Sequence, residues 1–135
     1  MIRAAVEAAP HTQIAAVTIL TSLTEADLSR IGIAGPADEA VRRLAALSVE
    51  AGATALVCSP NEVSAVRAEV GAGITLITPG VRPTGAATQD QVRVATPEQA
   101  LADGADLLVI GRPITGSPDP GAAAAAIAAS LRRQA

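Results

Sequence analysis

The fold is decided by residues 74–83, Ile-Thr-Leu-Ile-Thr-Pro-Gly-Val-Arg-Pro, and by a similar stretch at 107–113, Leu-Leu-Val-Ile-Gly-Arg-Pro. Each begins with a short apolar run and ends with glycine, arginine and proline. An apolar run without polar alternation is typical of a parallel strand that is covered on both faces. The carboxyl ends of parallel strands converge, so Arg82, Arg112 and backbone N–H groups should lie together, as in α/β barrels that bind a phosphate. A phosphorylated small molecule is therefore the expected ligand.

The rest of the chain alternates between similar strands and helices. Strands are predicted over 14–20, 53–58, 74–78 and 106–110. Helices are predicted over 25–30 with a Thr24/Asp27 capping box, over 36–51 with Pro36 at the first helical position, over 59–71 with Ser59 as N-cap and Pro60 at the first helical position, and after Thr96-Pro97 and Asp119-Pro120. In the second of these helices, Val41, Leu44, Ala45 and Leu47 are the predicted apolar stripe. This order predicts a single α/β domain over residues 1–135, with a parallel sheet and right-handed crossovers.

The composition excludes several classes of partner. Half of the 135 residues are apolar, which is enough for a core, but none is aromatic, so a surface that stacks nucleic-acid bases is not expected. A net charge of −3 also argues against a general polyanion binder. Cys58 is the single cysteine, and no apolar run is long enough for a membrane span. We expect a cytoplasmic protein that binds neither nucleic acid nor membrane.

The chain contains no lysine, because all ten basic residues are arginine. Arginine keeps its proton at every relevant pH, so a mechanism that needs an ammonium proton donor cannot be run by this chain alone.

Four residues are candidates for an anion site at the ends of the last two strands: Arg82, Gln91, Gly111 and Arg112. Each charge-assisted contact contributes about 1.5–3 kcal/mol, so together they can bring a phosphate monoester to about micromolar affinity. The alternative for each arginine is a surface ion pair. Thr21 or Ser22, after the first strand, either contacts a ligand or caps the next helix.

Other reactive residue types point to no second site. Cys58 is interpreted as a buried, inert thiol, because the single His11 lies before the first strand. One histidine, one cysteine and dispersed carboxylates give no metal-ligand spacing. Asp90 either orients Gln91 or an arginine, or is a solvated loop acid.

With these residues in place, the chain resembles the C-terminal half of the orotidine 5′-phosphate decarboxylase family. The matching segments are Ala-Val-Thr-Ile-Leu-Thr-Ser at 16–22, Leu-Val-Cys-Ser-Pro at 56–60, Ile-Thr-Pro-Gly-Val-Arg-Pro at 77–83, Asp-Gln at 90–91 and Val-Ile-Gly-Arg-Pro-Ile-Thr at 109–115. Their order and spacing make the resemblance specific over nearly the whole chain. It implies a (β/α)8 barrel that converts orotidine monophosphate to uridine monophosphate without a cofactor, and four strands here would be the last half of that barrel.

The resemblance also implies roles for the candidate residues. Arg82, Gln91, Gly111 and Arg112 would hold the phosphate, and Thr21 or its neighbour Ser22 would contact the pyrimidine ring. The family's catalytic Asp-x-Lys-x-x-Asp run and a further lysine are absent here, so no catalytic residue is assigned and the chain alone is expected to be inactive. We expect it to pair with an N-terminal half barrel or with itself. The alternatives are a non-catalytic phosphate-binding half barrel that self-associates, and another phosphate-binding barrel such as a pentulose-phosphate epimerase or a keto-gulonate phosphate decarboxylase.

Overall fold

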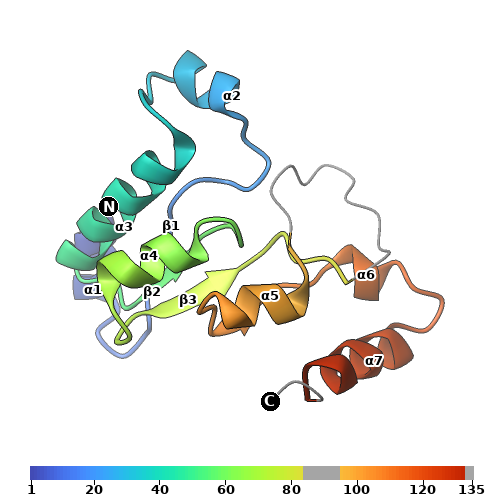
Figure 1. Cartoon of the computed structure of the whole chain (residues 1–135). Helices are drawn as coiled ribbons and strands as arrows, with labels where there is room; N and C mark the ends of the chain where they lie inside the picture. The colour runs from blue at the N-terminus through green and yellow to red at the C-terminus, as the bar shows by residue number, and fades with distance from the viewer. Residues whose placement is uncertain (84–94, 133–135) are drawn as a thin grey trace.

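The computed structural model describes residues 1–83 and 95–132, whose four strands form one parallel sheet in the order β1-β2-β3-β4 (Figure 1). The strands are β1 (Ala15–Val17), β2 (Ala55–Val57), β3 (Thr75–Thr78) and β4 (Leu107–Leu108). The helices are α1 (Ile2–Ala8), α2 (Glu25–Arg30), α3 (Ala37–Glu50), α4 (Val63–Val70), α5 (Pro97–Ala102), α6 (Arg112–Thr115) and α7 (Pro120–Arg132). The predicted parallel α/β half barrel is confirmed, although each strand is shorter than predicted.

Local capping signals place two helix starts correctly. Thr24 and Asp27 form the predicted capping box, with the Asp27 N–H donating to Thr24 Oγ1 at 3.3 Å and the Thr24 N–H donating to Asp27 Oδ2 at 3.0 Å. At α5, Thr96 Oγ1 accepts the Gln99 N–H at 3.2 Å and Pro97 is the first helical residue. Such caps satisfy N–H groups that have no partner within the helix.

The predicted start of α4 was wrong. The helix begins at Val63 with Glu62 as its N-cap, because residues 60–62 form a turn in which the Glu62 N–H donates to the Ser59 carbonyl. The Ser59 hydroxyl donates to the Glu62 carboxylate, so it does not cap the helix. Ser59 and Glu62 are both buried at this turn.

Two details of α3 also differ from the prediction. Pro36 is the N-cap, with an extended ψ of 150°, and the helix starts one residue later. Leu47 is 57% exposed, whereas Ser48 is buried and donates to the Leu44 carbonyl at 2.6 Å. The buried stripe therefore continues from Ala45 to Ser48, at i+3, because that position faces the sheet.

The core lies between the sheet and the helices on one of its faces. Leu56 and Leu76 pair in register in the central strands, and both are fully buried. Helices α3, α4 and α5 run along this side of the sheet in Figure 1. Their contributions to the core include Val41, Val66 and Ala100, which are also fully buried. Small and branched side chains allow this close packing of helix on strand.

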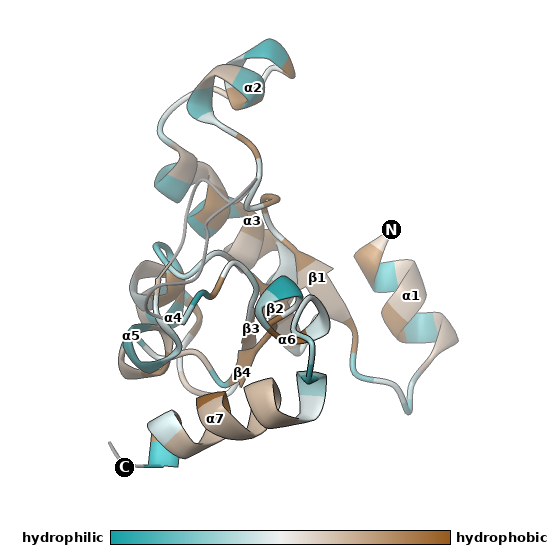
Figure 2. Ribbon diagram, turned by 90° about the vertical axis from the view of Figure 1, so that its right-hand side faces the viewer, coloured by the Kyte–Doolittle hydropathy of each residue, from teal (hydrophilic) through white to brown (hydrophobic). Residues whose placement is uncertain are grey.

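The opposite face of the sheet is largely uncovered. Val17, Val57, Ile77 and Leu107 lie side by side across the four strands. On the outer strands, Val17 is 55% exposed and Leu107 is 54% exposed. The prediction that the strands are covered on both faces is therefore wrong for β1 and β4, because no layer of the described chain packs against this side of the sheet. Figure 2 shows α1 beyond β1, apart from the other helices.

Candidate functional site

The carboxyl ends of β3 and β4 open into one pocket of about 280 Å³. Its described lining residues come from the segment after β3, from the end of β4 and from α6: Pro79, Gly80, Arg82, Val109, Gly111, Arg112 and Thr115. The structure therefore brings Arg82, Gly111 and Arg112 together, as their equivalent positions after neighbouring parallel strands predict.

Arg82 is held by the backbone on either side of it. Gly80 has a φ of 80°, a left-handed conformation that favours glycine, and it turns the chain at the end of β3. Val81 then forms a parallel bridge with Ala95, and the Arg82 N–H donates to the Ala95 carbonyl at 2.9 Å. These contacts fix the Arg82 backbone beside the start of α5.

The Arg82 side chain is buried but sparsely hydrogen-bonded. It is 8% exposed and lines the pocket. Within residues 1–83 and 95–132, the hydrogen bond of its guanidinium is from Nη1 to the Val81 carbonyl, at 2.8 Å. A guanidinium carries five N–H donors. Most of its donors therefore have no acceptor within the described residues.

Arg112 begins a helix that the sequence did not predict. Helix α6 spans Arg112–Thr115, with Gly111 as its N-cap and Pro113 in its first turn, where proline is favoured. A Cβ built on Gly111 would meet no described atom within 4 Å. Glycine is thus not demanded there by packing, and its missing side chain leaves open space at the pocket.

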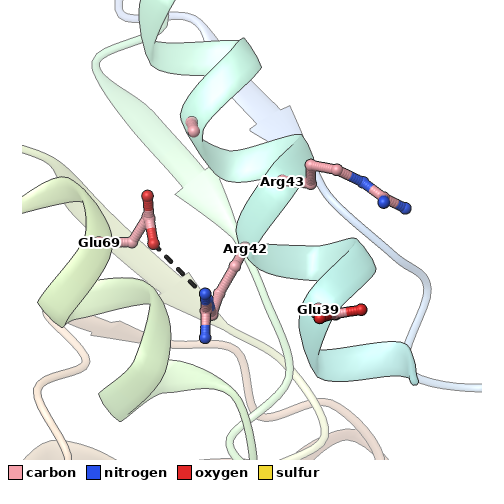
Figure 3. Close-up of a pocket in the computed structure, with 5 residues that line it drawn as sticks. Glu39, Arg42, Arg43 and Glu69 are labelled. Atoms are coloured by element: carbon pink, nitrogen blue, oxygen red, sulfur yellow. Dashed lines mark ion pairs between the residues drawn. The ribbon is translucent and has the colours of Figure 1, made fainter. Parts of the chain in front are cut away.

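The charge of this pocket distinguishes it from another surface pocket of similar size. In the pocket at the ends of β3 and β4, the charged residues of the described lining are two arginines, Arg82 and Arg112. A pocket of about 320 Å³ between α3 and α4 has Glu39, Arg42, Arg43 and Glu69 in its lining. Figure 3 shows Arg42 directed toward Glu69, to which its Nε lies 3.5 Å away, and Arg43 directed away. The mixed charges there give no net preference for an anion.

The predicted pyrimidine contacts are not among the described lining residues of this pocket. Thr21 is 8% exposed and lies in the turn between β1 and α2, and neither it nor the exposed Ser22 is among the described lining residues. Gln91 and Asp90 lie outside the described residues. Thr24, and not Ser22, provides the side-chain cap of α2.

Cys58 is buried at the end of β2, as predicted for an inert thiol. Burial, followed by the charge of Glu62, raises the pKa of its thiol to about 11, so the reactive thiolate is scarce at neutral pH. In the part of the chain that the structure describes, no group of three or more His, Cys, Asp or Glu residues could hold a metal ion. No helix in the same part is both long and apolar enough to cross a membrane.

The family model described as "Orotidine 5′-phosphate decarboxylase / HUMPS family" matches residues 1–127. The chain belongs to this family. The orotidine 5′-phosphate decarboxylase of Thermobifida fusca (strain YX) is 74% identical over 133 residues, which are 98% of this chain and 57% of that protein. The Frankia casuarinae protein of the same name is 67% identical over 131 residues, which are 97% of this chain and 48% of that protein. The chain thus spans about half the length of these curated relatives.

Two solved structures have a similar fold. The crystal structure of orotidine 5′-phosphate decarboxylase from Lactobacillus acidophilus matches with a TM-score of 0.79 and 34% identity, over 97% of this chain and 58% of that one. An uncharacterized conserved protein from Geobacillus kaustophilus matches with a TM-score of 0.76 and 31% identity. Both matches cover 58% of the solved chain, as expected for part of a barrel.

One lining residue of the Arg82/Arg112 pocket was missed in the sequence analysis. Thr115 belongs to the segment that carries the family resemblance, but no role was assigned to it because α6 was not predicted. Pro113 directly after Arg112 was the available signal, since proline commonly stands in a first helical turn.

Proposed function

We propose that this chain is the phosphate- and pyrimidine-binding part of an orotidine 5′-phosphate decarboxylase, which converts orotidine monophosphate to uridine monophosphate and CO2. The observation that carries the proposal is that Arg82 and Arg112 line the same pocket beyond β3 and β4. Two guanidinium groups match a phosphate dianion in charge and in the geometry of their donors. Gln91 and Gly111 complete the phosphate site in this proposal, and Thr21 or Ser22 contacts the pyrimidine.

Binding tests the phosphate site directly. Calorimetric titration of the chain with uridine monophosphate should show binding, and uridine should bind at least about tenfold more weakly because it lacks the charged group. Arg112→Ala should reduce the affinity for uridine monophosphate by about tenfold or more. Arg43→Ala is the matched control, because Arg43 is an exposed arginine on α3 outside this pocket. Equal affinities for the nucleotide and the nucleoside would overturn the phosphate site.

The chain by itself is expected to be catalytically inactive. Breaking the bond between C6 and the carboxylate leaves an electron pair at C6, which must then receive a proton. All ten basic residues of the chain are arginines, which do not release a proton at neutral pH. Purified chain should therefore leave the absorbance of orotidine monophosphate unchanged. Turnover well above the uncatalysed rate would contradict this expectation.

The uncovered sheet face supports the need for a complementary half barrel. Val17, Leu107 and Val109 are each about half exposed, at 55%, 54% and 49%. Parallel strands with one bare face and bare edges associate readily. We propose that the partner is an N-terminal half of the same family, which supplies the missing strands and the catalytic Asp and Lys residues. A second copy of this chain is the alternative partner.

Reconstitution distinguishes these partners. Mixing the chain with the part of the Thermobifida fusca relative that it does not cover should yield a one-to-one complex in light scattering, together with decarboxylase turnover. A stable dimer of the chain alone that excludes the added half would favour the self-associating, non-catalytic phosphate binder. If the chain stays monomeric and does not bind the added half, both forms of association are overturned.

A further inference from the structure

A neutral hydrogen-bond donor stands beside the two arginines of the pocket. Thr115 is the last residue of α6 and lines the pocket together with Arg82 and Arg112. It is three positions after Arg112, a spacing that places two side chains on neighbouring positions of one helix face. Thr115 is exposed, so its hydroxyl is accessible to a ligand.

The backbone of α6 fixes Thr115 relative to Gly111. The Thr115 N–H donates to the Gly111 carbonyl at 3.0 Å, and the Ile114 N–H donates to the same carbonyl at 2.8 Å. Gly116 closes the turn, because its N–H donates to the Arg112 carbonyl at 2.9 Å. A Cβ at Gly116 would lie only 3.0 Å from that carbonyl oxygen. The single turn is thus tight, and Thr115 is not carried on a free loop.

The hydroxyl of Thr115 is not used within the described structure. Threonine in a helix often donates to the carbonyl three or four positions earlier. Here the carbonyl four positions earlier, on Gly111, already accepts the two N–H groups of Ile114 and Thr115. Among residues 1–83 and 95–132, Thr115 Oγ1 takes part in no hydrogen bond, although other hydroxyls such as Ser130 do.

We propose that the Thr115 hydroxyl donates a hydrogen bond to a phosphate oxygen of the ligand, as a third side-chain donor beside Arg82 and Arg112. The inference rests on the proposed phosphate site and adds a residue to it. A hydroxyl differs from a guanidinium because it can also accept a hydrogen bond. It can therefore hold the P–OH group of a singly protonated phosphate, to which an arginine cannot offer an acceptor.

Thr115→Val tests this role, because valine keeps the branched shape and removes the hydroxyl. The affinity for uridine monophosphate, measured by calorimetry on the chain, should fall about tenfold, as expected for a hydrogen bond to a charged group. Thr115→Ser should restore most of the loss, and neither variant should change the binding of uridine. Thermal unfolding followed by circular dichroism checks that the Val variant is folded as well as the original chain.

The outcomes separate this inference from the proposed function. If Arg112→Ala weakens nucleotide binding while Thr115→Val leaves it unchanged, the phosphate site stands and the role of Thr115 is overturned. If the unaltered chain binds neither uridine monophosphate nor inorganic phosphate, the proposed site itself is overturned, and the role of Thr115 with it. A loss in Thr115→Val that extends equally to uridine would also contradict a phosphate contact.

Discussion

Arg67 and Arg82 are both largely buried arginines next to β3, but they lie at opposite ends of the strand. They also differ in how many described acceptors their guanidinium groups contact. At the amino end, the Arg67 guanidinium donates to the carbonyls of Gly71, Ile74 and Gly104 at 2.8 Å each and to Asp106 Oδ2 at 2.6 Å. At the carboxyl end, the Arg82 guanidinium donates to one described carbonyl, that of its neighbour Val81. The first arginine is saturated by the protein, whereas most donors of the second have no acceptor among the described residues, and we propose that they bind the ligand.

This contrast distinguishes a stabilising end of the sheet from a binding end, where we propose that the ligand is held. The Asp106 carboxylate accepts from Arg67 and also from the Leu76 N–H at 2.7 Å, so the cluster joins α4 to β3 and to the start of β4. Gly104 permits the approach, since a Cβ there would lie 3.3 Å from Arg67 Cγ. In α/β barrels the carboxyl end of the sheet carries the ligand site, and the other end contributes mainly to stability.

Removing the saturated arginine should have the largest effect on folding. Arg67→Ala removes the side-chain donor of three carbonyls and leaves the Asp106 carboxylate with only the Leu76 N–H among the described donors, so the free energy of unfolding should fall by about 3 kcal/mol. Urea unfolding measures this loss. Arg67→Lys should recover only part of it, because an ammonium lacks the planar fork that reaches several carbonyls at once. If Arg67→Ala changes the free energy of unfolding by less than about 0.5 kcal/mol, the amino end of the sheet is not the stabilising end.

The sequence allowed prediction of the binding end better than of the stabilising end. Arg82 and Arg112 could be placed together because each follows an apolar run, and parallel strands put their carboxyl ends on one side. Thr24 and Thr96 could be identified as caps because their partners lie three positions away. Arg67 gave no such signal, since its contacts with Gly104 and Asp106 span 37 and 39 residues.

Other features were missed for related physical reasons. Helix α6 has one turn, too short for any periodic pattern to reveal it. The bare face of the sheet was missed because Val17 and Leu107 are apolar, whether another layer covers them or not. The local composition of a strand does not show whether a second layer packs against it. The turn before α4 was misjudged because Ser59-Pro60 has a capping pattern, whereas the Ser59 hydroxyl pairs with Glu62.

The glycine that turns the chain toward Arg82 should affect both stability and binding. Gly80→Ala places a side chain at a φ of 80°, which costs about 1–2 kcal/mol for a residue with a Cβ. Because the same turn positions Arg82, the affinity for uridine monophosphate should fall as well. Gly73→Ala is the matched control: its Cβ would meet nothing within 4 Å, and its φ is not left-handed. Unfolding and titration of the two variants check this, and equal results for both would contradict it.

The stabilising end should respond to acid. The N–H of Leu76, followed by the guanidinium of Arg67, holds the pKa of Asp106 below its ordinary value of 3.8. This carboxylate therefore contributes stability above about pH 4, and the contribution is lost as the pH falls through the lower pKa of the folded state. Its magnitude is small, because the side chain is 48% exposed and solvent screens the charge.

Asp106→Asn isolates that contribution, because the amide keeps the shape and an acceptor for Leu76 but cannot ionise. The difference in unfolding free energy between the two proteins should be largest near neutral pH and should shrink below pH 4. Urea unfolding at a series of pH values measures the difference. A difference that stays constant from pH 7 to pH 3 would show that the ionised carboxylate adds nothing.

An arginine outside both ends of the sheet should have the smallest effect. Arg42 Nε lies 3.5 Å from Glu69 Oε2, and the two side chains are 48% and 40% exposed (Figure 3). Such a pair contributes less than about 1 kcal/mol and weakens further with salt. Arg42→Ala, Glu69→Gln and the double variant, compared by urea unfolding, should give a coupling energy below about 0.5 kcal/mol. Binding of uridine monophosphate should not change, and a loss in Arg42→Ala would place a ligand contact between α3 and α4 instead of at the strand ends.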